Sequence, residues 1–261
     1  MSFLNKIKLN NKKIFILGGS GLIGSKIAKN ILSIGGSVLI LDIKKKKELK
    51  NIKYIKFNCE KLSSSEKNIK KIFKKFGCPD VFINCSYPRT SDWNQCSFKK
   101  INLKRMRKNI EIHMNSFAWI SKVIADEMVK NKIKGSIVNL NSIYGLLGQD
   151  LNIYEKTIMS ENMPYAIIKG GLANLVRQMA SYYGKYGIRV NNVCPGGLKG
   201  HVAGHSNFQE KQFIKNYSKK VPLKRLGEPE EAANVVIFVA SEAASYITGS
   251  NILVDGGWTV I

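Results

Sequence analysis

The stretch KIFILGGSGLIG, from Lys13 to Gly24, decides the fold of this chain. Its first five residues are a short continuous apolar run, which is typical of a strand buried in a parallel sheet. Glycines follow at Gly18, Gly21 and Gly24, and apolar residues then recur at helical spacing. A strand, a glycine turn and a helix in this order predict the opening of a βαβ unit.

Short apolar segments and helical patterns alternate to the end of the 261 residues. The expected strands are residues 13–17, 37–41, 54–57, 81–85, 136–141, 189–194 and 251–254. The expected helices are residues 22–32, one ending near 76 with a capping box of Ser63 and Glu66, about 105–130, 165–183, and one after Glu228. This alternation predicts an α/β fold with one domain over residues 1–261, a doubly wound parallel sheet and helices on both faces. Ligands of such sheets bind at the carboxyl ends of the strands.

The composition narrows the class of protein. A hydrophobic fraction of 44% is ordinary for a globular chain, and no apolar run approaches the roughly 20 residues that a membrane helix needs. The first ten residues lack the apolar core and cleavage site of a signal peptide, so we expect a cytoplasmic protein without a membrane partner. The five cysteines form no CxxC pair, which argues against a disulfide framework and against a metal site.

The net charge of +24 raises the question of an anionic partner. The lysines are scattered along the chain apart from Lys44 to Lys47, and there is no zinc-finger spacing, RNP-type motif or basic tail. We therefore expect no nucleic-acid partner. A solvated lysine surface and a preference for anionic small molecules both remain open as explanations of the charge.

The glycine turn is a candidate phosphate site. Glycine lets the backbone approach a pyrophosphate, whose charge the N–H groups at the helix N-terminus stabilise. The residues expected to contact a dinucleotide cofactor here are Gly18, Ser20, Gly21, Leu22, Ile23 and Gly24.

Asp42 closes the second expected strand. A carboxylate at this point accepts hydrogen bonds from a ribose diol and repels a 2′-phosphate, which favours NAD. The lysines from Lys44 to Lys47 follow immediately and could receive that phosphate. NAD is the expected cofactor, and NADP is the alternative.

Tyr165 and Lys169 form a YxxxK pair, whose spacing places both side chains on one face of a helix. Free tyrosine has a pKa of about 10 and is a poor acid or base at neutral pH. A nearby ammonium favours the phenolate and lowers that pKa, which makes the phenol a usable proton donor and acceptor. Ser142, at the end of an expected strand, is placed to hydrogen-bond a substrate oxygen.

With these residues in place, the chain resembles the short-chain dehydrogenases/reductases, which have a Rossmann-type fold. The matching segments are GGSGLIG, INCS at 83–86, VNLNS ending at Ser142, YAIIK, VNNVCPGG at 190–197 and ITGSNILVDGGW at 247–258. The resemblance implies a nicotinamide cofactor, catalysis by Ser142, Tyr165 and Lys169, and a homodimer or homotetramer. The further cofactor contacts that it implies are Asn58, Cys59, Asn84, Cys85, Ser86, Pro195, Gly196, Gly197 and Leu198, besides Tyr165 and Lys169.

Several positions depart from the family pattern. Leu17 replaces a usual threonine, Leu22 replaces the middle glycine of the turn, and residues 85–87 replace the end of an NNAG segment. The fourth catalytic residue of the family is an asparagine, and His113 aligns with it, with Asn115 as the other candidate. A histidine there could continue a proton relay to Lys169, because its ring both donates and accepts.

The segment between Ser142 and Tyr165 is longer than in most relatives. Its polar part, residues 149–164, is expected to be an insertion that forms part of the substrate pocket, because loops at such positions carry specificity. We expect Tyr154 within it, and Arg89 beyond the fourth strand, to contact the substrate.

A narrower resemblance suggests the substrate. The segments SIYG, IYE, MPYAIIK and SYPR are similar to those of oxidoreductases of flagellin-glycan and sialic-acid-like nonulosonic sugar biosynthesis. This implies a small anionic substrate, a phosphorylated or nucleotide-linked amino sugar. The alternatives are a 3-oxoacyl-carrier-protein reductase and a non-catalytic NAD-binding regulatory module.

Overall fold

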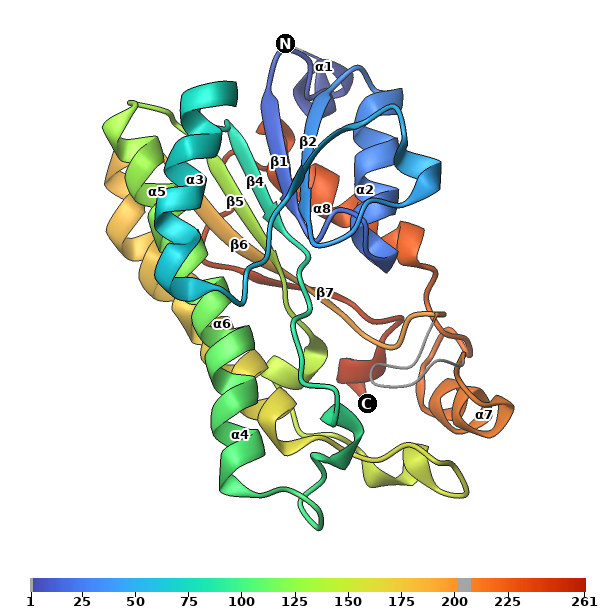
Figure 1. Ribbon diagram of the computed structural model, residues 1–261. Coiled ribbons are helices and arrows are strands. Elements are labelled where there is room, and N and C mark those ends of the chain that lie inside the picture. The colour runs from blue at the N-terminus through green and yellow to red at the C-terminus, as the bar shows by residue number, and fades with distance from the viewer. Residues whose placement is uncertain (1, 201–207) are drawn as a thin grey trace.

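The computed structural model describes residues 2–200 and 208–261, which form a three-layered α/β domain around a seven-stranded parallel sheet (Figure 1). The strands are β1 Lys13–Leu17, β2 Ser37–Asp42, β3 Lys53–Lys56, β4 Val81–Asn84, β5 Ser136–Leu140, β6 Arg189–Pro195 and β7 Asn251–Val254. Their order is β3-β2-β1-β4-β5-β6-β7, so the winding direction reverses between β1 and β4. Ligands of doubly wound sheets bind at this reversal, at the carboxyl ends of the strands.

The residues of β1 show how the sheet separates two cores. Phe15 and Leu17 face α3 Leu62–Phe76, α5 Ser116–Lys130 and α6 Met163–Tyr183. Ile14 and Ile16 face α2 Leu22–Ser33 and α8 Pro229–Ala240 on the other side (Figure 1). All four side chains are at most 3% exposed, and each such burial contributes about 1.5–3 kcal/mol. A strand buried on both faces explains the continuous apolar run in the sequence.

The remaining helices are peripheral to the sheet. They are α1 Phe3–Ile7, α4 Leu103–Asn109, α7 Lys211–Lys220, the π-helical turn η3 Ile110–Asn115, and the 3₁₀ turns η1 Lys47–Leu49, η2 Trp93–Gln95, η4 Ile143–Gly145, η5 Leu151–Tyr154, η6 Gly184–Tyr186, η7 Glu242–Ala244 and η8 Trp258–Val260. The helix expected at about 105–130 is thus α4, η3 and α5 in succession. A π-turn widens the helix locally and re-aims its side chains.

The expected capping box of Ser63 and Glu66 is wrong. Helix α3 already begins at Leu62, with Lys61 as an N-cap that makes no side-chain hydrogen bond, so Ser63 lies inside the first turn. A reciprocal capping box occurs instead at α8, between Glu228 and Glu231. An N-cap residue has non-helical backbone angles. Because the connection from β3 enters the helix already at Leu62, Ser63 has helical angles and cannot act as the N-cap.

No helix within residues 2–200 and 208–261 is both long and apolar enough to cross a membrane. The same ranges contain no group of three or more His, Cys, Asp or Glu side chains arranged to hold a metal ion.

Candidate active site

The glycine turn brings backbone to the carboxyl end of β1. Gly18 has a φ of +74°, and a Cβ there would lie 2.6 Å from the backbone nitrogen of Ser86. A Cβ on Gly24 would collide with the carbonyl oxygen of Gly18. Helix α2 begins at Leu22 with Gly21 as its N-cap, and no side chain caps it. Its first N–H groups therefore have no side-chain acceptor and follow a glycine-rich turn in which Ser20 carries the one side chain, which fits a pyrophosphate.

Asp42 lies at the end of β2 and is tied to this turn. Its Oδ2 accepts a hydrogen bond from the backbone N–H of Ser20 at 2.9 Å, and its Oδ1 accepts one from Ile43 at 2.7 Å. Oδ1 also accepts the backbone N–H of Lys44 at 3.4 Å, whereas Oδ2 keeps a lone pair for a further donor. The carboxylate is thus fixed beside the phosphate turn, where a ribose diol would lie.

The segment after β4 adds a buried amide. Asn84 is 0% exposed, and its Oδ1 accepts hydrogen bonds from the backbone N–H and the hydroxyl of Ser86. Its Nδ2 has no hydrogen-bond partner among the described residues. Cys85 is half-buried beside it, whereas Cys59 lies in the core, where burial raises the pKa of its thiol to about 11. Asn58, next to Cys59, accepts the backbone N–H of Glu60. Asn84 and Ser86 therefore offer polar atoms at the winding reversal, and the buried Cys59 adjoins Ser86.

The loop after β6 is held from two sides. The backbone N–H of Gly196 donates to Val254 of β7 at 3.0 Å, and that of Gly197 donates to Tyr217 Oη of α7 at 2.5 Å. Leu198 accepts a hydrogen bond from the side chain of Gln209 through its carbonyl oxygen. Pro195 ends β6, so these four expected cofactor residues form a loop anchored to α7.

The structure brings Ser142, Tyr165 and Lys169 together. The ammonium nitrogen of Lys169 lies 5.6 Å from the centre of the Tyr165 ring and donates a hydrogen bond to the carbonyl oxygen of Leu140 at 3.0 Å. Ser142 follows β5, and its Oγ accepts the backbone N–H of Tyr144 at 3.2 Å. One side chain from the sheet edge and two from α6 thus converge, as the spacing predicted.

The pKa of Tyr165 differs from the expectation. Burial raises it to about 12, and the Ser142 hydroxyl offsets only part of that rise. Burial also lowers the pKa of Lys169 to about 7, so its ammonium is only partly populated at neutral pH. The expected lowering of the tyrosine pKa by this cation therefore does not hold for the protein alone. The phenol is protonated at neutral pH.

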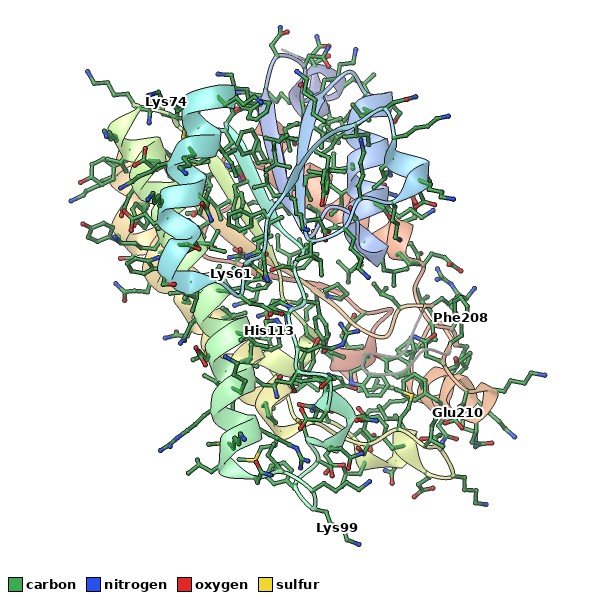
Figure 2. The ribbon with its side chains drawn as sticks, in the orientation of Figure 1. Lys61, Lys74, Lys99, His113, Phe208 and Glu210 are labelled. Carbon is green, nitrogen blue, oxygen red and sulfur yellow. The ribbon has the colours of Figure 1, made fainter. Side chains whose placement is uncertain are left out.

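His113 lies on η3 and points into the protein, as Figure 2 shows, whereas Asn115 is exposed. The imidazole is 0% exposed and packs edge-on against the ring of Tyr87, with 5.1 Å between the ring centres. Neither ring nitrogen has a hydrogen-bond partner among the described residues. Burial, followed by the positive charges of Lys169 and Arg89, holds the pKa of His113 well below its usual range. The ring is neutral and faces the site.

A cavity of about 210 Å³ opens beside Tyr165. It is lined by Tyr87, Trp93, Asn94, Tyr144, Gln149, Tyr154, Ile158, Met159, Ser160, Glu161, Asn162 and Tyr165. Most of these residues belong to the 149–164 segment, so that segment forms a large part of the wall. No lysine or arginine of the described ranges is among the lining residues.

The two expected substrate residues occupy different places. Tyr154 lines the cavity, and its hydroxyl donates to Gln149 Oε1 at 3.0 Å. Arg89 does not line it, because the guanidinium is exposed and lies 5.5 Å from the centre of the Tyr87 ring. Arg89 therefore lies outside the cavity, over the ring of Tyr87, which lines it.

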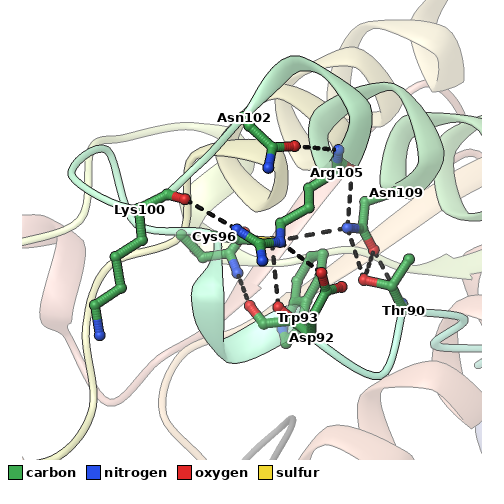
Figure 3. A network of polar contacts seen from close by, with 9 residues as sticks. Thr90, Asp92, Trp93, Cys96, Lys100, Asn102, Arg105 and Asn109 are labelled. Carbon is green, nitrogen blue, oxygen red and sulfur yellow. Dashed lines mark hydrogen bonds and ion pairs between the residues drawn. The ribbon is translucent and has the colours of Figure 1, made fainter.

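Trp93 was missed by the sequence reasoning. It lies on η2, in the loop after β4, and its carbonyl oxygen accepts a hydrogen bond from Asn162 at 3.1 Å. Ion pairing of Asp92 with Arg105 holds this loop against α4, beside a network around Asn109 (Figure 3). The sequence signal that could have revealed this wall residue is an aromatic side chain in the segment that follows β4.

Helix α7 anchors the 149–164 segment, which the sequence also did not reveal. Lys220 pairs with Asp150 at 2.7 Å, and Asn216 Nδ2 donates to the carbonyl oxygen of Glu155 at 2.9 Å. The ring of Phe213 stacks on Tyr154, with 6.2 Å between the ring centres. Because α7 also holds Gly197, one helix contacts both the cavity wall and the expected cofactor loop.

Comparison with known proteins gives consistent matches. Residues 20–259 match the family model described as enoyl-(acyl carrier protein) reductase. The chain is 28% identical to post-translational flagellin modification protein A of Campylobacter coli, over 96% of this chain and 99% of that protein. It is 33% identical to 3-oxoacyl-(acyl-carrier-protein) reductase FabG of Buchnera aphidicola, over 96% of this chain and 89% of that protein. A solved short chain dehydrogenase from Leptospira borgpetersenii with bound NAD+ is 28% identical, with a TM-score of 0.85 over 99% of this chain and 96% of that one.

Proposed function

This chain belongs to the short-chain dehydrogenase/reductase family of NAD(P)-dependent oxidoreductases, and on that premise we propose that it acts on a carbohydrate. The hydride would move to or from a carbonyl or hydroxyl carbon of a phosphorylated or nucleotide-linked amino sugar in surface-glycan biosynthesis. The supporting observation is the small aromatic and amide-lined cavity beside Tyr165. Its volume of about 210 Å³ is below the roughly 300–1,000 Å³ of drug-sized sites and suits a single sugar ring. The likeness to a flagellin modification protein agrees with this proposal.

The cofactor fits the residues at the winding reversal. The glycine-rich turn would hold its pyrophosphate, Asp42 would hold the adenosine ribose diol, and the loop at Gly196 and Gly197 would border its nicotinamide. Bound NAD(P) supplies or accepts the hydride. Because the Asp42 carboxylate is fixed by Ser20 at the point where a 2′-phosphate would lie, we expect NAD to be preferred.

The protein's own groups handle the proton. Ser142 would hydrogen-bond the substrate oxygen and orient it toward the phenol of Tyr165. In the reductive direction that phenol, which is protonated at neutral pH, donates its proton to the oxygen. In the oxidative direction the phenolate form of Tyr165 would take the proton of the substrate hydroxyl, so Tyr165 must first lose its own proton. Such a positioned acid or base contributes about 10²–10⁴-fold to the rate.

We further propose that His113 continues the proton path beyond Lys169. Both groups lie against the ring of Phe117, whose centre is 5.4 Å from that of the His113 ring and 5.2 Å from Lys169 Nζ. His113→Asn keeps a donor and an acceptor, whereas His113→Leu keeps only bulk. We expect Asn to retain most of kcat and Leu to lower kcat and displace its pH profile, with KM little changed. Equal loss in both variants without a change in the pH profile would show a packing role instead.

The anionic part of the substrate must lie outside the cavity, since its described lining contains no cation. Arg89, exposed over Tyr87, is our candidate for the phosphate contact at the rim. Arg89→Gln should raise KM for a phosphorylated sugar and leave KM for the unphosphorylated sugar unchanged. The same change in both KM values would exclude a phosphate contact.

We also propose a cytoplasmic homodimer or homotetramer. Trp119 of α5 and Tyr182 of α6 are 42% and 57% exposed, and they offer apolar surface for a second copy. Light scattering of the wild type and of Trp119→Glu tests this proposal. A monomeric wild type would contradict it.

The experiment that decides the function is a substrate screen with both cofactors. We expect oxidation or reduction of amino-sugar phosphates or nucleotide-linked amino sugars, faster with NAD than with NADP. Acetoacetyl thioester is the competing substrate, because the chain is also similar to a 3-oxoacyl-carrier-protein reductase. Activity on the thioester alone would overturn the sugar proposal. NAD binding without turnover of any compound would favour the regulatory module.

A further inference from the structure

The cavity beside Tyr165 differs in charge from the rest of the protein. The chain contains 42 lysines and arginines against 18 acidic residues. The described lining of the cavity contains none of those cations and one carboxylate, Glu161. Because the lining offers no cation, an anion that entered this cavity would lose water without gaining a partner. Its composition instead favours a positively charged group.

Glu161 is held in place but keeps binding capacity. Its Oε1 accepts the backbone N–H of Phe98 at 3.0 Å, and the side chain is half-buried. Among the described residues no lysine, arginine or histidine nitrogen lies within 4.0 Å of its carboxylate. The neighbouring Asn162 fixes this part of the chain, since its side chain caps α6 at Tyr165 N and also bonds Trp93. The carboxylate is thus a preorganised acceptor close to the candidate catalytic tyrosine.

Aromatic rings form much of the remaining wall. The ring of Trp93 is 6.2 Å from that of Tyr165 at 84°, and the ring of Tyr144 is 6.4 Å from it at 74°. Tyr87 and Tyr154 add two more rings to the lining. Aromatic faces attract cations through their quadrupole, most strongly where water is excluded. Rings set at steep angles to one another present faces and edges to a ligand from several directions.

From this combination we propose that Glu161 is a specificity-determining residue that binds a protonated, unacylated amino group of the substrate. The aromatic walls would surround the ammonium while the carboxylate pairs with it. This inference rests on the proposed sugar oxidoreductase function and adds that the amine is free when it enters the site. An N-acetyl group is neutral, so it would lose the ion pair and would also need more room in a cavity of about 210 Å³.

Calorimetry on the NAD+-saturated protein tests the proposal with glucosamine 6-phosphate, N-acetylglucosamine 6-phosphate and glucose 6-phosphate. The wild type should bind the free amine at least about tenfold more tightly than either neutral analogue. Glu161→Gln should abolish that preference and leave the affinity for glucose 6-phosphate unchanged. The matched control is Glu155→Gln, an exposed glutamate of the same segment that does not line the cavity. It should behave as wild type.

The preference should also fall as pH rises through the pKa of the sugar amine, which a purely structural role of Glu161 would not produce. Equal binding of the three sugars by the wild type, or a preference that survives in Glu161→Gln, overturns the inference while the sugar function stands. No binding of any of the three, with turnover of acetoacetyl thioester, overturns the sugar function as well.

Discussion

At the carboxyl edge of the sheet, the half formed by β1, β2 and β4 is closed mainly by backbone groups, whereas the half beyond β5 and β6 is closed by side chains from separate segments. In the first half, Gly18 and Gly24 let backbone segments of the protein pack directly against each other, because a Cβ at either position would collide with backbone atoms. In the second half, Trp93, the 149–164 segment and α7 meet across long sequence distances. Close approach to a dinucleotide depends on backbone that glycines leave accessible, whereas loops on a rigid scaffold carry specificity through their side chains.

The largest effect is expected when Tyr165, the proposed proton donor between the two halves, is replaced. Tyr165→Phe should lower kcat by about 10³-fold, because a positioned acid or base contributes about 10²–10⁴-fold. NAD binding, measured by calorimetry, should stay within about threefold of wild type, since the ring remains in place. Retained turnover would show that Tyr165 is not the acid or base.

A substitution of one glycine should disrupt the cofactor half. Gly18→Ala places a Cβ 2.6 Å from the Ser86 nitrogen and forces alanine to a φ of +74°, so we expect a loss of about 1–3 kcal/mol in stability and weakened NAD binding. The control is Gly184→Ala, where a Cβ would meet nothing within 4 Å. Denaturant melts with and without NAD measure both effects. Wild-type NAD affinity in Gly18→Ala would mean that the turn is not the phosphate site.

Lys169 lies between the two halves, and its burial predicts how the stability of the protein depends on pH. Its pKa is about 7 in the folded protein against an ordinary 10.5, so the unfolded chain binds more protons between these pH values. Stability of the wild type should therefore rise with pH through this window. Lys169→Met should lack this contribution, so it should be more stable than the wild type by about 1 kcal/mol or more at pH 6, the difference should shrink as pH rises, and the variant should be inactive. Urea melts from pH 6 to 10 check it, and an unchanged slope would contradict it.

The same contrast explains what could be predicted from the sequence. The strands, the glycine turn and the convergence of Tyr165 with Lys169 follow from local patterns, because spacing along one element fixes which face each residue occupies. The prediction of a capping box at Ser63 was wrong because the first residue of the helix depends on the conformation of the connection after the preceding strand. The contacts of Trp93 with Asn162 and of Lys220 with Asp150 join residues 69 and 70 positions apart. No short motif encodes such pairs.

The smallest effect is expected for a substitution in α7, which tests whether this helix supports only the substrate half or both halves. Lys220→Met removes the ion pair with Asp150, whose partners are 34% and 20% exposed, so stability should fall by no more than about 1 kcal/mol. Because α7 stays attached through Asn216 and Phe213, we expect KM for the sugar to rise about threefold, in line with that energy, and kcat to change little. The matched control is Lys215→Met, an exposed lysine of α7 that forms no ion pair within the described residues.

NAD affinity of Lys220→Met shows whether the two halves depend on each other, since Tyr217 of the same helix holds the loop at Gly197. Unchanged NAD affinity means that the halves are built and act separately, whereas a parallel loss means that α7 transmits displacement of the substrate wall to the cofactor loop.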